Sequence, residues 1–334
     1  MALDEIRIRR LAGQHLLAPA DTQTVVKDLC GLQAQFLSHA LHGLRIRTGT
    51  VNTDGLVKSW TNRGTMHLVS IEDLPIFLHE GRTHYLRPVD TLQSDAYIDA
   101  NRKAYFANAI MDAVSQGIEE REALKAVCEK AGMSDSESKS LFDPWGGLIR
   151  ALCETGKLCH KVQEKKAYQL CPAFEPMAME PAQLELARRY FTHFGPAKIK
   201  DAAYFFGTTQ AKVKSWLKLL PVTETTLDGK EYFHIDNGIA IGELPECLFL
   251  AGFDQLMLGY EKTESLILPK EHMRDIFNLA GIVRPSILLY GNVAGWWNMK
   301  DRKLSIKMFG SYDADMIAET ANGLWTDIKQ IEFL

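Results

Sequence analysis

One pattern occurs twice in this chain and restricts the folds that it can adopt: two helices joined by a turn, followed by a short β-hairpin. In the first copy, residues 119–130 and 145–154 have the apolar spacing of amphipathic helices, and Gly156 ends the second of them. The segments 158–162 and 167–171 then predict two strands on either side of a charged turn.

The second copy has the same order of elements. Residues 199–206 and 210–220 predict the two helices, and residues 223–226 and 232–235 predict the strands. An Asp-Gly pair at 228–229 lies between these strands and is a strong signal for a hairpin turn. Two helices followed by a β-hairpin, or wing, form the winged-helix domain, a common DNA-binding unit. The repeat therefore predicts tandem winged helices.

The rest of the chain is helical near the N-terminus and rich in strands near the C-terminus. A helix capped by Asp21 or Thr22 is predicted from an apolar spacing that continues to Leu32. After residue 239, short strand-like runs separated by turns predict a small β-barrel or an open sheet. The expected fold class is α+β.

The charge of the chain gives mixed evidence on nucleic acid. There are 38 Lys and Arg against 42 Asp and Glu, a net charge of −4, whereas nucleic-acid binders are usually basic. Phosphate binding depends on local patches, however. Lys165 and Lys166 lie on the first wing, and Lys212 and Lys214 lie on the predicted helix 210–220. We interpret these lysines as phosphate contacts, with an ordinary solvated surface as the alternative.

Several classes of protein are disfavoured. No apolar run reaches the roughly 20 residues that span a bilayer, and residues 1–5 carry acids where a secretory signal has its apolar core. We therefore expect a cytoplasmic protein that does not bind a membrane. The six cysteines form no CxxC pair, and the chain has no phosphate-binding loop, HExxH or GxSxG motif. No metal and no cofactor are expected.

Four stretches resemble one known family, and they occur in its order along most of the chain. They are GLQAQ at 31–35, RGTMHLV at 63–69, FGPA at 194–197 and FDQLMLGY at 253–260. The third is followed by the aromatic run 204–207, and the fourth by GIVRP and GNVAGW further downstream. Together they resemble the AlkZ-like family of winged-helix DNA glycosylases.

The resemblance implies tandem winged helices closed by a C-terminal β-barrel. The corresponding segments are a first winged-helix region at 1–100, further winged helices at 101–176 and 177–238, and the barrel at 239–334. The family's activity is hydrolysis of the N-glycosidic bond of alkylated purines, which in some members includes unhooking of interstrand crosslinks. The implied partner is double-stranded DNA that carries alkylated bases or crosslinks, and the implied enzyme is a monofunctional glycosylase.

The family's Gln–apolar–Gln motif makes Gln33 and Gln35 the expected catalytic residues. An alkylated purine with a charged ring is a good leaving group, so the enzyme mainly needs to position a water, and neutral amides can do this. Two residues apart is about 200° around an α-helix, so both amides cannot share one helical face. Either a helix ends near Gln35, or one glutamine is structural.

Further polar residues are candidates for the DNA-facing cleft. Arg63, Thr65 and His67 occupy alternate positions of a predicted strand and share one side of it. They line the cleft, near the two glutamines, or they form a hydrogen-bonded structural set. Asp254 in the fourth motif stabilises a cation or caps a turn.

Two other functions remain open on the sequence. A non-catalytic winged-helix regulator would use the same folds, and a family member could also have lost DNA binding, in keeping with the acidic balance. The Gln–apolar–Gln motif favours the enzyme. Because no heptad for dimerisation is visible, we expect a monomer.

Overall fold

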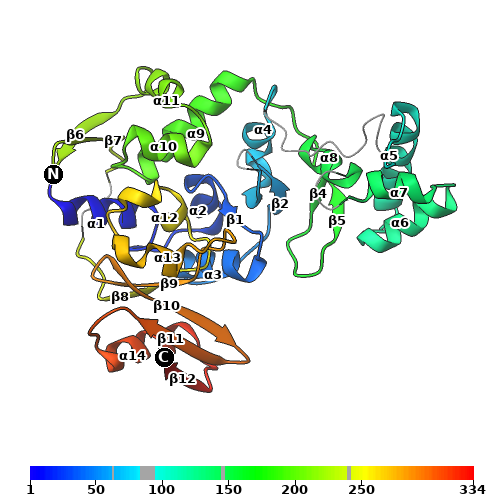
Figure 1. Cartoon of the computed structure of the whole chain (residues 1–334). Coiled ribbons are helices and arrows are strands. Elements are labelled where there is room, and N and C mark those ends of the chain that lie inside the picture. Colours follow the sequence, from blue (N-terminus) through cyan, green and yellow to red (C-terminus); the bar gives the residue numbers. More distant parts are fainter. Residues whose placement is uncertain (62–63, 83–94, 144–146, 239–241) are drawn as a thin grey trace. The chain divides into compact units, whose positions relative to one another are not determined.

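The computed structural model describes residues 1–61, 64–82, 95–143, 147–238 and 242–334, and it divides into two compact units (Figure 1). One unit joins Met1–Asn52 to Leu184–Leu334, and the other is Thr53–Gln183. Both contain helices and strands, which confirms a mixed helix-and-strand protein. The four segments predicted from the sequence do not coincide with these two units. Since one unit can hold more than one winged helix, the finer division stays a prediction.

The unit Thr53–Gln183 contains an antiparallel sheet whose strands pair in the order β3-β2-β4-β5. The strands are β2 (Leu56–Trp60), β3 (Met66–Ser70), β4 (Leu158–His160) and β5 (Tyr168–Leu170). The helices are α4 (Leu74–Phe77), α5 (Ala100–Ser115), α6 (Arg121–Lys130), α7 (Asp135–Leu141) and α8 (Leu148–Glu154). The apolar faces of α5, α6, α7 and α8 share one core, in which Phe106, Ile110, Leu124 and Cys128 are fully buried.

This unit contains the first predicted helix–helix–hairpin copy as α6, α8, β4 and β5. An additional helix, α7, was not predicted. It begins at a capping box in which the Ser134 hydroxyl accepts from the backbone N–H of Glu137 and the Glu137 carboxylate accepts from the N–H of Ser134. Arg102 of α5 holds that carboxylate at 2.7 Å, which lowers the pKa of Glu137 to about 2. The sequence of α7 is mostly polar, so apolar spacing did not predict this helix. The contacts at its first turn stabilise it.

The other unit contains the second predicted copy. Its N-terminal elements are α1 (Leu3–Gly13), α2 (Thr22–Asp28), β1 (Leu32–Gln33) and α3 (Leu37–Thr48). After these come α9 (Met179–His193), which begins in the unit Thr53–Gln183, α10 (Ile199–Phe206), α11 (Gln210–Leu217) and the hairpin of β6 (Thr223–Leu227) and β7 (Lys230–His234). The hairpin turns at Asp228 and Gly229, whose φ angles of 49° and 72° are those of the turn predicted for an Asp-Gly pair.

An aromatic cluster packs α9 against α10. Tyr190 stacks on Phe194 with centroids 5.0 Å apart and contacts Phe205 at the same separation. The Tyr190 hydroxyl is buried, and it donates a hydrogen bond to the carbonyl of Gly259 at 2.7 Å. Gly207, with a φ of 60°, ends α10 in the left-handed conformation that glycine adopts without strain.

The C-terminal part of this unit is an open sheet rather than a closed barrel. Its strands are β8 (Cys247–Phe249), β9 (Ser286–Leu289), β10 (Asn292–Lys300), β11 (Lys303–Met308) and β12 (Gln330–Phe333), in that order across the sheet. β12 pairs with β11 in parallel, and in the described ranges β8 and β12 remain edges. The prediction of a closed barrel for 239–334 is therefore wrong, and the alternative prediction of an open sheet is confirmed.

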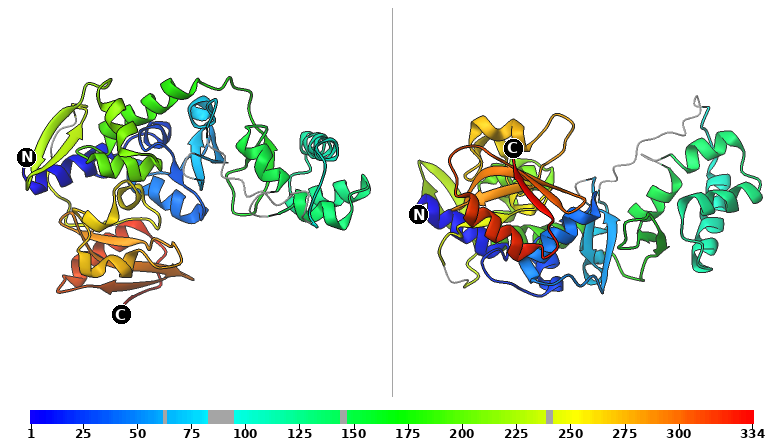
Figure 2. Two further views of the ribbon diagram at one scale, coloured as in Figure 1. Left: turned by 45° about the horizontal axis from the view of Figure 1, so that its top comes forward. Right: turned by 90° about the horizontal axis from the view of Figure 1, so that it is seen from below.

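The open sheet is covered by α14 (Ala314–Leu324), as Figure 2 shows. Ile317 and Ala321 of this helix are fully buried against Trp297 and Ile306 of the sheet. Two short helices, α12 (Gln255–Leu258) and α13 (Met273–Ile276), lie between β8 and β9 in the sequence. Among the helices of the described ranges, none has both the length and the apolarity needed to cross a bilayer.

Candidate active site at the Gln33 and Gln35 loop

Gln33 and Gln35 lie on the connection between α2 and α3, outside any helix. Asp21 caps α2, as one of the two predicted caps, by accepting from the backbone N–H of Thr24 at 3.0 Å. The helix ends at Asp28, earlier than the apolar spacing to Leu32 indicated.

The early end of α2 has a local cause. Cys30 and Gly31 have φ angles of 53° and 79°, and the N–H of Gly31 donates to the carbonyl of Val26 at 2.8 Å. This is the bonding of a Schellman helix end, with Cys30 in the left-handed position where glycine is usually found. The chain thus leaves the helix immediately before the Gln–apolar–Gln motif. The objection that a helix would separate the two amides does not apply.

The two glutamines have different environments. Gln33 belongs to the short strand β1 and is only 7% exposed, whereas Gln35 lies in a bend before α3 and is exposed. A buried amide is held by its surroundings, while an exposed amide is available to a ligand. This division fits a pair in which Gln35 faces the substrate and Gln33 orients the loop. The convergence of the two amides on one water stays a prediction.

The loop is supported by Gly252–Gln255, which we call the support segment. The Gln255 side-chain amide donates to the carbonyl of Gly31 at 2.7 Å. Phe253 stacks on Phe36, the residue after Gln35, with centroids 5.7 Å apart. A Cβ on Gly252 would lie 2.9 Å from the ring of His39, so a larger residue at this position would have to displace that ring. The first and fourth sequence motifs are therefore in direct contact.

Asp254, within the support segment, is part of a buried ion pair. Its carboxylate accepts two hydrogen bonds from Arg47 at 2.8 and 2.9 Å, and the exposed fractions of the two side chains are 1% and 0%. It also accepts from the N–H of Leu256 and so caps α12. These contacts support the predicted capping role of Asp254. They do not support its predicted position in an open cleft. A carboxylate already neutralised by Arg47 has little charge to offer a sugar cation.

The predicted polar strand lies in the unit Thr53–Gln183. Arg63 is outside the described residues. His67 is 2% exposed, and its Nδ1 lies 2.8 Å from the Thr61 hydroxyl and 3.1 Å from the carbonyl of Thr65. These contacts favour the hydrogen-bonded structural set over a cleft-lining role for His67. The predicted proximity of Thr65 and His67 to the glutamines stays a prediction.

The predicted phosphate-contacting lysines occupy exposed or partly exposed positions. Lys165 is 72% exposed and forms a 2.6 Å ion pair with Glu120. Lys166 borders a cavity of about 80 Å³ together with Arg121 and Arg150. Lys212 and Lys214 lie on α11, the first of them half-buried and the second exposed. An exposed ion pair adds little to stability, so a DNA phosphate can compete with Glu120 for Lys165.

Two histidines, His39 and His42, follow the glutamines on α3. His42 is buried, donates a hydrogen bond from Nε2 to the carbonyl of Phe249 at 2.8 Å, and stacks on Trp325. Burial lowers the pKa of His42 to about 4, so its ring is neutral at pH 7. Burial also lowers the pKa of His39.

Sequence reasoning missed the residues that support the loop. Gln255 and Phe253 belong to a motif that was recognised, but nothing in the sequence indicated that they contact Gly31 and Phe36. Their separation of more than 200 residues conceals the contact. The available indication of this contact was that the first and fourth motifs belong to the same family pattern.

Comparison with known proteins shows which class has this fold. Over 100% of both chains the structure matches the DNA glycosylase AlkZ of Streptomyces sahachiroi, with a TM-score of 0.78 and 21% sequence identity. At that identity the likeness shows a shared fold. A sequence relative from Streptomyces sahachiroi, named interstrand DNA cross-link repair glycosylase, is 26% identical over 314 residues, which cover 85% of this chain and 84% of the relative.

The family model described as DNA glycosylase AlkZ-like matches residues 26–324. The match includes the Gln33 and Gln35 loop and its support segment. This chain belongs to the AlkZ-like family of DNA glycosylases, as its four motifs indicated.

Proposed function

We propose that this protein is a monofunctional DNA glycosylase that hydrolyses the N-glycosidic bond of alkylated purines, including purines joined in interstrand crosslinks. The observation that carries the proposal is the position of Gln33 and Gln35 outside any helix, on a loop held by the support segment. The printed name of the sequence relative, a cross-link repair glycosylase, supports the crosslink as a substrate.

The proposed step uses neutral groups. Gln35 positions a water against C1′ of the sugar, and the support segment holds the loop that carries both glutamines. The water oxygen bonds to C1′ while the bond from C1′ to the base nitrogen breaks. The bonding electron pair leaves with the base and neutralises its positive ring, and the surplus proton of the water passes to solvent. Preorganised polar contacts of this kind stabilise the charge that develops in the transition state.

DNA binding is assigned to tandem winged helices. The orders α6–α8–β4–β5 and α10–α11–β6–β7 both have the two helices and the hairpin of that domain. We infer that the partner is double-stranded DNA with alkylated bases or crosslinks, and that the protein acts as a monomer. The segments 1–100, 101–176 and 177–238 remain the proposed winged-helix regions.

The test uses a labelled duplex with a single N7-methylguanine, incubated with the full-length protein. A monofunctional glycosylase leaves an intact strand with an abasic site, so cleavage is expected only after alkali. Cleavage before alkali would contradict the monofunctional assignment, because it requires a nucleophilic amine that opens the sugar. A crosslinked duplex run in parallel is expected to separate into single strands under denaturing conditions. Persistence of the crosslink, with methylguanine still released, would remove crosslinks from the proposal.

The wing lysines give a second prediction. Replacing Lys165 and Lys166 together by glutamate is expected to weaken binding to duplex DNA at least tenfold at low salt. The slope of log affinity against log salt should also fall by about 2, because two phosphate contacts are lost. Fluorescence anisotropy at several salt concentrations measures both quantities.

A matched control is available in the open sheet. Lys303 is ion-paired with Glu332 at 2.8 Å, as Lys165 is with Glu120, and Lys300 is exposed beside it. Replacing Lys300 and Lys303 by glutamate changes the net charge equally. If both pairs of substitutions weaken binding to the same extent, the effect belongs to net charge and the wing is not the contact.

A further inference from the structure

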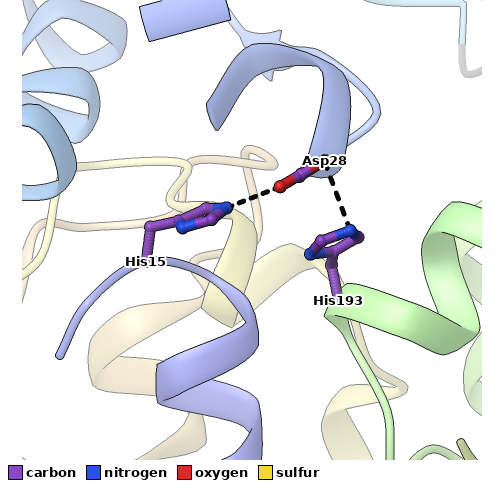
Figure 3. Close-up of side chains that lie close together, drawn as sticks. All are labelled: His15, Asp28 and His193. Atoms are coloured by element: carbon purple, nitrogen blue, oxygen red, sulfur yellow. Dashed lines mark hydrogen bonds and ion pairs between the residues drawn. The ribbon is translucent and has the colours of Figure 1, made fainter. Parts of the chain in front are cut away.

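Three side chains from the ends of three helices converge in the unit that carries the glutamine loop (Figure 3). His15 follows α1, Asp28 is the last residue of α2, and His193 is the last residue of α9. The Asp28 carboxylate lies between the two rings, with one oxygen 2.7 Å from Nε2 of His15 and the other 3.2 Å from Nε2 of His193. All three side chains are partly buried, with exposed fractions of 13%, 21% and 14%.

The hydrogen bonding of His193 determines what its second nitrogen can do. Its Nδ1 lies 3.1 Å from the carbonyl of Gly13, which can only accept, so Nδ1 carries the proton. In the neutral ring Nε2 then presents a lone pair to the carboxylate of Asp28. Two acceptors that face each other need a cation between them, either a proton on Nε2 or a metal ion. A ring N–H donated to a backbone carbonyl is also the arrangement that orients metal-binding histidines.

The backbone holds the three groups in place. A Cβ on Gly13 would lie 2.6 Å from the carbonyl oxygen of His193, so the ends of α1 and α9 are in close contact. His15 has a φ of 57°, an uncommon conformation for a residue with a side chain, and its N–H donates to Ala12 at 3.0 Å. The side chain of His15 therefore projects from a tight, defined turn.

Neighbouring cations on α9 are already engaged. Arg188 binds Glu185 with two hydrogen bonds at 2.6 and 2.7 Å, and Arg189 binds the same carboxylate at 2.8 Å. Glu185 balances one of these two positive charges. Asp28 is therefore the anionic group of the cluster that faces both rings.

We propose that His15, Asp28 and His193 form a binding site for a divalent transition-metal ion, with Zn²⁺ as its representative. Two imidazoles and a carboxylate are a donor set that zinc takes in proteins, with a fourth position left for water. The ligand atoms all lie within 4.8 Å of one another. Tetrahedral coordination at about 2.0–2.1 Å separates ligand atoms by roughly 3.3 Å. The 2.7 Å contact between His15 and Asp28 therefore opens by about 0.6 Å when the ion replaces the proton between them.

A bound ion would tie together the ends of α1, α2 and α9. Asp28 precedes Gln33 by five residues, so the ion would also secure the point at which the chain leaves α2 for the glutamine loop. Metal binding to the folded state alone stabilises that state by mass action. The site is thus a structural staple beside the proposed active site, and it takes no part in the hydrolysis.

The test is a Zn²⁺ titration of the full-length protein after treatment with a chelator and its removal. Isothermal titration calorimetry is expected to give one site per chain, and Zn²⁺ should raise the Tm. His193→Asn and His15→Asn should each weaken binding at least tenfold and abolish the rise in Tm. His272→Asn is the matched control, because His272 also lies beside a carboxylate, 3.1 Å from Asp275, but belongs to no cluster of three metal ligands among the described residues.

The wild-type protein supplies a readout that does not depend on variants. Bound Co²⁺ should show the visible absorption of nitrogen and oxygen ligands, without the near-ultraviolet band of a cobalt–thiolate bond. Thiolate absorption would place the ion at the neighbouring thiols of Cys159 and Cys171 instead and would overturn the proposal. Absence of Zn²⁺ binding, or equal binding by all variants, would also overturn it and would leave a protonated His193 paired with Asp28.

Discussion

Replacing Gln35 by alanine is expected to slow the release of alkylated base roughly a hundredfold or more, the usual effect of losing one preorganised polar contact in a transition state. Gln35 is exposed on a loop whose backbone is held by other residues, so DNA affinity and the free energy of unfolding should change little. Single-turnover release from a duplex with N7-methylguanine measures the chemical step.

The control for this experiment is Gln116→Ala, which removes an exposed glutamine at the end of α5. It should release base at the wild-type rate. Because neutral amides act in the proposed step, the wild-type rate should also vary only weakly between about pH 6 and 9. If Gln35→Ala releases base as fast as the wild type, both glutamines are scaffold and the catalytic assignment is wrong.

Asp254→Asn is expected to lower the free energy of unfolding by about 3–5 kcal/mol, the usual effect of removing one partner of a buried ion pair. Asparagine can still cap α12, but it leaves the guanidinium of Arg47 charged and fully buried. Arg47 also holds the carbonyls of Gln14 and Gly43 at 2.9 Å each, so its displacement would disturb α1 and α3 as well. Urea unfolding followed by circular dichroism measures the change.

The matched control is Asp4→Asn, which breaks an ion pair with Arg7 whose carboxylate is 65% exposed. Its effect should stay below about 1 kcal/mol, as is usual for surface pairs. The double variant Arg47→Met with Asp254→Leu should recover much of the lost stability, because it removes both buried charges. A loss below about 1 kcal/mol for Asp254→Asn would mean that water reaches Arg47 and that the support segment is not rigid.

The local pattern of the chain was predictable where each element carries its own signal. The Asp-Gly pair at 228–229 specifies its hairpin, and the helices of both repeats follow from apolar spacing. The helix through Leu32 was overextended, because apolar spacing does not register the left-handed turn at Cys30 and Gly31. Closure of the C-terminal sheet was also not predictable. It depends on whether edge strands pair, and the parallel strand β12 joins β11 without completing a barrel.

The candidate site was likewise predictable only in part. A motif pointed to Gln33 and Gln35, but the groups that hold their loop come from residues more than 200 positions away. The pair of Arg47 with Asp254 and the cluster of His15, Asp28 and His193 likewise join distant segments. Neither has a spacing signal in the sequence, because the side chains come together only when these distant segments pack against one another.

The most direct test of the proposed activity is to identify the product itself. Wild-type protein is incubated with a duplex that contains N7-methylguanine, and the free bases are quantified by mass spectrometry beside the abasic sites in the same DNA. Hydrolysis at the sugar predicts free 7-methylguanine in the same molar amount as abasic sites, both well above the spontaneous loss in buffer. Binding of the duplex with no base released above that background would contradict the glycosylase and would leave a winged-helix DNA-binding protein.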